Sequence, residues 1–593
     1  MLKERNSMSS NYQWDLSEIY NSDEEWHKCC EKILKEIKSF EKYRNIRDID
    51  GSFILELTLK IEGLFVEIMR IYVYANSKYY EDTMNSTYIG LKNKSDDLSK
   101  DALTAISFYD PLILKIGEVK INKFIKETKG LELYKHDLDN IFRKAKHTLS
   151  KDLEEVLAGI SSFTNLPINI YNTIVYAEAQ FEQATDKDGN KKEVTHAERI
   201  KLAESRDKIL RESSYKSYSK YYFSKRESIS GLYAGLIRKN NFIAKTRGYK
   251  GPVEAALYEN NIPVSVYENL ITTVNKNIHV IHKYTDLQRK ILGLDSIKPW
   301  DMSVPLVKDI DFEVPFEKAK ELILNSSAIM DKEYVSIIEN IFNSRYIDVY
   351  ENKNKRSGAF SWGTYGTPPY IMMNYKDNLS SLFTLAHELG HSVHSHYSRT
   401  SQPFVYSNYA IFTAEVPSTL NEALLMDHLL KTTEDKQMKK YLISYKLRDF
   451  MSTFFRQAML SEFELEAHKL DGSGKIIDAN AFSEIYGNLL KKYYGPNFQV
   501  DELIANDWAK VPHFFTEFYV YQYSTGYAAS TSISKSILDG KPGAVSSFIE
   551  LLKSGSSDYP IPLLKKAGVD MSSPKPIEDA IAVFSGLLDE FEK

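Results

Sequence analysis

A histidine, a glutamate and a second histidine follow one another in the pattern His-Glu-x-x-His, at His387, Glu388 and His391. Histidines four residues apart share one face of a helix, so both imidazoles can bind the same metal ion. Glu388 lies one residue further round the helix, where its carboxylate can take a proton from a metal-bound water molecule. The pattern predicts a zinc centre that hydrolyses peptide bonds. The alternative is a surface helix with two incidental histidines.

A catalytic zinc ion takes three protein ligands and keeps one open position, so a third ligand is needed. His394 shares the helix, but the rise along the axis places it roughly 10 Å from His387, which is too far for easy sharing of one ion. Glu415 and Glu422 are seven residues apart, nearly two helical turns, so both can face one site. One of them would bind the metal and the other would hold a ligand histidine, unless both are solvated surface residues.

The elements that must position these residues are predicted to be mainly helices. Leu382, Ala386, Leu389 and Val393 recur at helical spacing, which buries one side of a helix and turns the two histidines to another side. Apolar stripes broken by charge recur in the same way over residues 55–71. The fold class is therefore mainly α.

Two segments have the composition of strands, residues 169–176 and residues 370–375. The second precedes the His-Glu-x-x-His helix and predicts a small β-sheet beside it. Asp188-Gly189-Asn190 predicts a plain turn, because the acidic pattern of a calcium loop is missing. Without internal repeats or a long linker, we expect an N-terminal helical region over 1–190 and a catalytic region over 191–593.

Composition excludes several classes of protein. The chain has 593 residues, enough for two or more lobes, and carries 76 basic against 81 acidic side chains with no basic stripe, so nucleic acid is not an expected partner. No apolar stretch is long enough to span a bilayer, and no signal peptide is evident. The adjacent pair Cys29 and Cys30 cannot close a useful disulfide loop. We expect a cytoplasmic protein without a membrane partner; the oligomeric state is not indicated.

The segment from His387 to His391, followed by Glu415-Val416-Pro417-Ser418, resembles the active site of thimet-oligopeptidase-like zinc peptidases, in particular the oligoendopeptidase F branch. The resemblance implies that Glu415 is the third zinc ligand and that Glu422 supports a ligand. Asn421-Glu422-Ala423 is superficially similar to the ligand motif of thermolysin, so Glu422 as the ligand remains the rival assignment.

A segment rich in tyrosine, residues 512–523, extends the resemblance. By itself such a stripe is more typical of packing than of catalysis. The resemblance implies that His513 and nearby tyrosines, Tyr519, Tyr521 and Tyr523, face the substrate and stabilise the oxyanion of the tetrahedral intermediate.

Residues 358–363 and 370–375 resemble the loop and strand beside the substrate cleft of that family. The implied fold is a helical ellipsoid with a deep channel, which admits short unstructured oligopeptides and excludes folded proteins. The expected function is a metalloendopeptidase with one Zn2+ per chain, Glu388 acting as general base. An exopeptidase with Glu422 as ligand and a non-catalytic peptide-binding protein are the alternatives.

Overall fold

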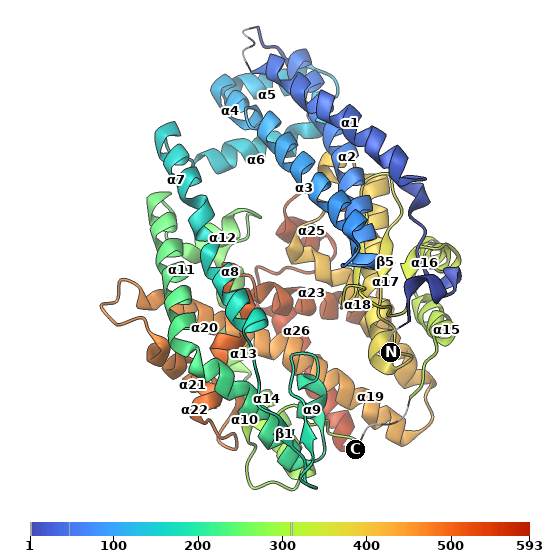
Figure 1. Cartoon of the computed structure of the whole chain (residues 1–593), viewed down its shortest axis with the longest axis vertical. Coiled ribbons are helices and arrows are strands. Elements are labelled where there is room, and N and C mark those ends of the chain that lie inside the picture. The colour runs from blue at the N-terminus through green and yellow to red at the C-terminus, as the bar shows by residue number, and fades with distance from the viewer. Residues whose placement is uncertain (1–2, 45, 47, 309, 311) are drawn as a thin grey trace. The chain divides into compact units, whose positions relative to one another are not determined.

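The computed structural model describes residues 3–593 except 45, 47, 309 and 311, together with all side chains of that part except those of residues 151, 158, 161, 162 and 164. The chain divides into two compact units (Figure 1). Unit 1 comprises Met1–Lys146, Phe312–His428 and Ile533–Val569, and unit 2 comprises His147–Asp311, Leu429–Ser532 and Asp570–Lys593. The predicted region 1–190 thus contributes to both units, which divide it after Lys146.

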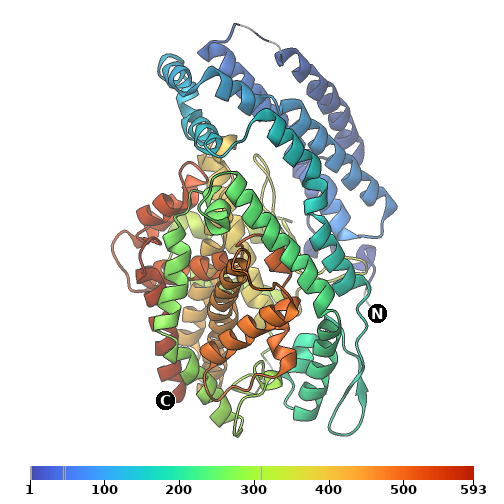
Figure 2. The same cartoon turned by 90° about the vertical axis from the view of Figure 1, so that its left-hand side faces the viewer.

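Unit 1 is mainly helical, and its long N-terminal helices lie side by side in Figure 1 and again in Figure 2. Its helices are α1 (Asp23–Ser39), α2 (Gly51–Glu81), α3 (Ser86–Ile106), α4 (Tyr109–Ile116), α5 (Glu118–Glu127), α6 (Lys135–Ala145), α15 (Phe316–Ser327), α16 (Lys332–Asn343), α17 (Leu379–Ser401), α24 (Ala544–Ser554) and α25 (Pro560–Lys566). Two further helices, α18 (Ile411–Thr432) and α23 (Tyr521–Leu538), run across the division of the chain.

Helix α2 illustrates why these segments are helical. The Asp50 side chain accepts a hydrogen bond from the Phe53 N–H at 2.8 Å and so caps the first turn, whose amide groups lack partners within the helix. Leu57, Leu64 and Ile68 recur at helical spacing and are buried against the neighbouring helices. The later part of the predicted apolar stripe over residues 55–71 therefore faces the core, whereas Leu59 in its earlier part is 50% exposed.

A three-stranded sheet in unit 1 contacts helix α17. Its strands are β3 (Ile347–Asp348), β5 (Tyr370–Met372) and β4 (Phe360–Trp362), with β5 in the middle. Strand β3 is parallel to β5, and β4 is antiparallel to it with Ser361 opposite Ile371. The prediction of a mainly α fold with a small sheet beside the His-Glu-x-x-His helix is confirmed.

A buried charge cluster fixes the outer strand β3. Asp348 is 1% exposed and pairs with the Lys355 ammonium at 2.6 Å and with the Arg5 guanidinium. Burial raises the pKa of Asp348, but the two cations outweigh it, and the pKa lies below its ordinary value. Because the Val349 N–H also donates to the Tyr12 carbonyl, the N-terminal segment is tied to this edge of the sheet.

Unit 2 is also mainly helical. Its helices are α7 (Lys151–Thr164), α8 (Leu166–Asn172), α9 (Arg199–Glu204), α10 (Lys208–Ser224), α11 (Arg226–Thr246), α12 (Pro252–Tyr258), α13 (Val264–Lys276), α14 (His279–Ile291), α19 (Lys436–Asp449), α20 (Arg456–Leu470), α21 (Ala479–Tyr494), α22 (Glu502–Ala505) and α26 (Lys575–Glu592). The predicted turn at residues 188–190 joins the antiparallel strands β1 (Ala184–Thr185) and β2 (Lys191–Lys192), with Gly189 at a φ of 82°.

The strand predicted over residues 169–176 is wrong. These residues belong to α8 and to a π-helical turn over Thr173–Ala177. Their many β-branched side chains favour a strand, but Pro167 starts a helix well and the contacts of the folded unit decide the outcome. Tyr171 is buried, and its hydroxyl donates to the Ala509 carbonyl at 3.1 Å. Among the described residues, no helix is long and apolar enough to cross a membrane.

Candidate metal centre and active site

Helix α17 carries the His-Glu-x-x-His pattern and begins at a polar cap. The Asn378 side chain accepts a hydrogen bond from the Ser381 N–H at 2.9 Å. The leucines and alanine of the predicted apolar side, Leu382, Ala386 and Leu389, are at most 1% exposed. Burial of this side fixes the rotation of the helix about its axis and leaves the two histidines together on another side.

The three predicted metal ligands come together in unit 1. His387 Nε2 lies 3.3 Å from Glu415 Oε2, and His391 Nε2 lies 3.6 Å from the same oxygen. One ligand atom from each of the three side chains lies within 4.8 Å of the others. This group can hold a metal ion.

A close approach of α17 and α18 brings Glu415 to the histidines. A Cβ atom at Gly390 would lie 2.5 Å from the Pro417 carbonyl oxygen and 2.6 Å from Ser418 Cα, so only glycine fits there. The Asn421 amide also donates to the Ala386 carbonyl at 3.2 Å. The glycine of the motif therefore sets the spacing between the helices that carry the ligands.

Two further side chains orient the candidate ligands. His387 Nδ1 donates to Glu422 Oε1 at 2.6 Å, which leaves Nε2 directed at the site as the nitrogen that can bind a metal ion. The Ser418 hydroxyl donates to Glu415 Oε2 at 3.0 Å. Glu422 thus lies on the far side of the His387 ring from Glu415.

The electrostatics of the group favour a cation. Burial lowers the pKa of His387, but Glu415 and Glu422 raise it well above its ordinary value. Burial raises the pKa of Glu415, and its contacts with the two histidines lower it to about 2. Burial and the neighbouring His387 lower the pKa of His391 to about 4, so this ring is neutral at pH 7. The His387 and His391 imidazoles and the Glu415 carboxylate, with the Glu422 carboxylate behind the His387 ring, form a donor set suited to a divalent cation.

Glu388 has the environment of a general base. It is 6% exposed, and burial raises the pKa of its carboxyl to about 7, with the charge of Glu415 adding to the effect. His387 and a hydrogen bond from the Ser361 N–H act in the opposite direction. A carboxyl group with a pKa near the working pH can both accept and return a proton.

His394 lies apart from the metal-binding group. It is 2% exposed, and its ring stacks on Tyr409 with centroids 3.5 Å apart. Burial lowers the pKa of His394 well below its ordinary value. The ring is therefore a neutral packing group.

His513 and the predicted tyrosines belong to unit 2. His513 is exposed; its ring lies parallel to that of Tyr519 at 6.0 Å, and the Tyr523 hydroxyl lies 3.5 Å from its Nε2. Tyr521 is buried and packs on Tyr267 with ring centroids 5.2 Å apart. The structure thus groups His513, Tyr519 and Tyr523 within their own unit, and the role of all four residues at the oxyanion stays a prediction.

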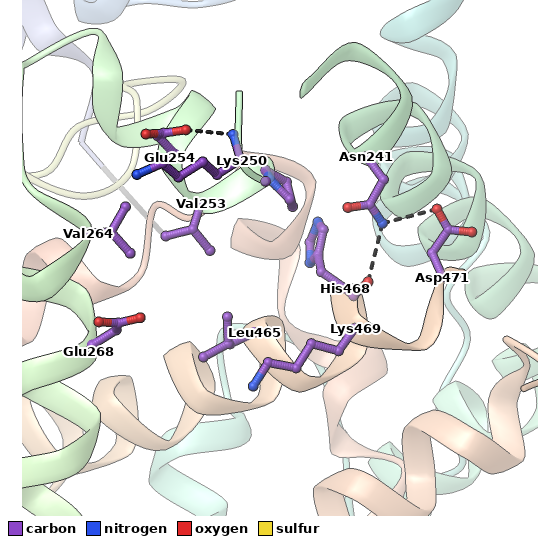
Figure 3. A pocket seen from close by; sticks show the side chains of 12 residues that line it. Asn241, Lys250, Val253, Glu254, Val264, Glu268, Leu465, His468, Lys469 and Asp471 are labelled. Atoms are coloured by element: carbon purple, nitrogen blue, oxygen red, sulfur yellow. Dashed lines mark hydrogen bonds between the residues drawn. The ribbon is translucent and has the colours of Figure 1, made fainter. Parts of the chain in front are cut away.

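A cavity of about 600 Å³ lies in unit 2 among α11, α12, α13 and α20 (Figure 3). Its polar groups largely satisfy one another. The Asn241 amide donates to Asp471 Oδ2 at 3.0 Å, and the Lys250 N–H donates to Glu254 Oε2 at 2.6 Å. Within the described part of the chain, the group of side chains that could hold a metal ion is His387, His391 and Glu415 in unit 1, and it lies outside this cavity.

Sequence reasoning missed the serines around the site. Ser361 lies in the segment 358–363 and Ser418 in the segment 415–418, but the spacing within these segments predicts no function for a serine. Ser392 lies four residues after Glu388. The spacing from Glu415 to Ser418 is a detectable signal, because a side chain three residues on can reach back within a helix. The contact between Ser361 on strand β4 and Ser392 on helix α17 leaves no such local pattern, because the two residues are 31 positions apart.

The fold and the donor set together define a helical metallopeptidase with its His-Glu-x-x-His motif on one helix and a glutamate on the next. The family model "Peptidase family M3" matches residues 201–583, and the model "Oligopeptidase F" matches residues 113–181. The chain therefore belongs to peptidase family M3, in its oligoendopeptidase F branch, and is a metalloendopeptidase.

Similar proteins cover the whole chain. Oligopeptidase PepF of Bacillus subtilis is 40% identical over all of this chain and 88% of its own length, and an oligoendopeptidase F homolog of Borreliella burgdorferi is 35% identical over 99% of both. A crystal structure of a putative peptidase from Chlamydophila abortus matches with a TM-score of 0.89 at 32% identity, over 100% of this chain and 99% of the other. Oligoendopeptidase-F from Enterococcus faecium matches with a TM-score of 0.75 at 32% identity, over 96% and 98%.

Proposed function

We propose that this protein is a cytoplasmic zinc-dependent endopeptidase that hydrolyses internal bonds of short, unstructured oligopeptides. His387, His391 and Glu415 are the zinc ligands, and Glu388 is the general base. The observation that carries the proposal is that one ligand atom each of His387, His391 and Glu415 lie within 4.8 Å of one another. Glu388, the residue after His387, is a buried carboxyl group whose pKa is raised to about 7.

Two of the three donor distances are close to those of a zinc site. Ligand atoms about 2.0–2.1 Å from a tetrahedral ion lie roughly 3.3–3.5 Å from one another. Glu415 Oε2 lies 3.3 Å from His387 Nε2 and 3.6 Å from His391 Nε2, close to this spacing. Two imidazoles and one carboxylate also match the ligand set of hydrolytic zinc sites that keep one position open.

Each residue of the site has a distinct task. A zinc ion held there supplies a lowered pKa for a water molecule and polarises the scissile carbonyl. Glu388 takes the proton of the attacking water and returns it to the leaving amine. Glu422 holds the Nδ1–H of His387 and keeps Nε2 available as a ligand.

The substrate is an extended peptide. Strand β4 is an outer strand of the sheet and lies against α17, and such a strand can pair with a peptide backbone while tolerating many side chains. His513, Tyr519 and Tyr523, with Tyr521 less directly because it is buried, are proposed to stabilise the oxyanion.

Metal depletion and reconstitution tests the proposal. After chelation and removal of the chelator, the apoprotein should be inactive on a quenched fluorescent oligopeptide. Titration with Zn2+ should restore activity with an end point at one ion per chain. Unchanged activity of the metal-free protein would contradict the proposal, and so would zinc binding that needs none of His387, His391 and Glu415.

A further inference from the structure

Two serines join strand β4 to helix α17 next to the proposed general base. Ser361 Oγ lies 2.8 Å from Ser392 Oγ, with Ser361 on β4 and Ser392 on α17, one turn beyond Glu388. Ser392 is completely buried. The pair is a contact between two elements that are 31 residues apart in sequence.

The direction of the hydrogen bonds follows from a count of protons. A serine hydroxyl donates one hydrogen bond and can accept others. Ser392 Oγ donates to the Glu388 carbonyl at 3.0 Å, which uses its only proton. Ser361 must therefore be the donor between the two hydroxyls. Ser392 accepts this hydrogen bond and donates its own to the Glu388 carbonyl, so it links β4 to the backbone of Glu388.

The same strand residue also meets the Glu388 side chain. The Ser361 amide faces the Glu388 carboxylate and lowers its pKa, while the Ser361 hydroxyl contacts Ser392 of α17 directly. Glu388 has a long side chain with several rotatable bonds, and a fixed donor restricts the rotamers it can adopt. The amide can do this only while β4 keeps its distance from α17.

We infer that Ser392 is a positioning residue for Glu388. Its hydroxyl, acting through Ser361, holds β4 at the distance from α17 at which the Ser361 amide meets the Glu388 carboxylate. The inference rests on the proposed role of Glu388 as general base. It predicts an effect on the chemical step that is separate from metal binding and from folding.

The first variant is Ser392→Ala, compared with Ser398→Ala as a matched control. Ser398 is also fully buried on α17, and its hydroxyl donates to the Ser407 carbonyl at 2.6 Å, away from β4. Ser392→Ala should lower kcat roughly tenfold, the usual scale for a residue that orients a catalytic group, with KM and zinc content unchanged. Ser398→Ala should change thermal stability but not kcat.

A shape-matched pair at the strand separates the hydroxyl from packing. Threonine and valine have nearly the same shape and differ by the hydroxyl, and both are compatible with a strand. Ser361→Thr should have a kcat roughly tenfold above that of Ser361→Val. Because Ser392→Ala and Ser361→Val break the same contact, the double variant should be no more than about twofold slower than the slower single variant.

These outcomes can be told apart from failure of the proposed function by measuring Glu388→Gln in parallel. If Glu388→Gln is inactive while Ser392→Ala keeps the wild-type kcat, the proposed base stands and the positioning inference is wrong. Equal kcat for Ser361→Thr and Ser361→Val, multiplicative effects in the double variant, or a loss that appears only in KM or zinc content would each overturn the inference as well. Wild-type activity of Glu388→Gln would instead refute the proposed function.

Discussion

Replacement of Glu422 by glutamine tests which glutamate binds the metal. The 2.6 Å contact between Glu422 Oε1 and His387 Nδ1 is a charge-assisted hydrogen bond, a class that contributes about 1.5–3 kcal/mol. A glutamine keeps the shape and a neutral acceptor but loses the charge. We therefore expect Glu422→Gln to weaken zinc binding by about 10–100-fold, or about 1.4–2.7 kcal/mol, and not to abolish it.

The matched variant is Glu415→Gln, which alters an atom of the proposed ligand set itself. Zinc affinity is measured for both variants by competition with a chromophoric chelator at pH 7.5, and kcat is measured at saturating zinc. Glu415→Gln should weaken zinc binding by more than Glu422→Gln, and Glu422→Gln should regain most activity once zinc is saturating. If Glu422→Gln binds no zinc while Glu415→Gln binds it normally, Glu422 is the ligand and the present assignment is refuted.

Three further predictions concern the framework around the site. Gly390→Ala forces a Cβ atom against the Pro417 carbonyl and should destabilise the fold by about 1–3 kcal/mol and weaken zinc binding. Thermal unfolding with and without zinc measures both effects, and a wild-type melting temperature under both conditions would contradict the prediction. Asp348→Asn leaves Lys355 buried without its carboxylate and should cost about 3–5 kcal/mol in urea unfolding at pH 7, whereas a cost below 1 kcal/mol would mean that the pair is dispensable. The pKa of Asp348 in the folded state lies below its ordinary value of 3.8, so the contribution of Asp348 to stability is complete above pH 3.8 and is lost as the pH falls through the folded-state pKa. On acidification from about pH 5 to about pH 2.5, the wild type should therefore lose more stability than Asp348→Asn.

The shared position of the two histidines on one helix could be predicted because it depends on local spacing. His387 and His391 share a helix face for geometric reasons, and the buried residues Leu382, Ala386 and Leu389 fix the rotation of that helix in the fold. The same periodicity predicted the helix over residues 55–71, and the apolar and aromatic composition of residues 370–375 predicted a strand, which the structure has at Tyr370–Met372. Each of these inferences uses the spacing between successive residues of one segment, which is less than two helical turns.

Other features depend on contacts between distant segments. The β-branched run at 169–176 has strand propensity, yet it folds as helix because its neighbours in unit 2 bury Tyr171. A seven-residue spacing does not distinguish Glu415 from Glu422 as the ligand, and the proposed assignment rests on the direction of the His387 ring. The Ser361 and Ser392 contact likewise has no sequence pattern, because nothing in either segment indicates the other.

The roles of His513 and the tyrosines came from the resemblance and not from spacing. Within unit 2 the structure explains why spacing is a poor guide: Tyr519 and Tyr523 surround His513, whereas Tyr521, between them in sequence, turns into the core. Because α23 begins at Tyr521, residues two apart point to nearly opposite sides of the helix, so Tyr521 packs inward while Tyr523 faces His513.

The most direct test of the central claim is cleavage of an end-blocked fluorogenic peptide of about eight residues by the wild type and by Glu388→Gln, with bound zinc quantified in both. The account predicts internal cleavage by the wild type and loss of activity in Glu388→Gln with one zinc ion per chain retained. Equal activity of the two proteins, or a zinc-loaded wild type that leaves every blocked peptide intact, would contradict it.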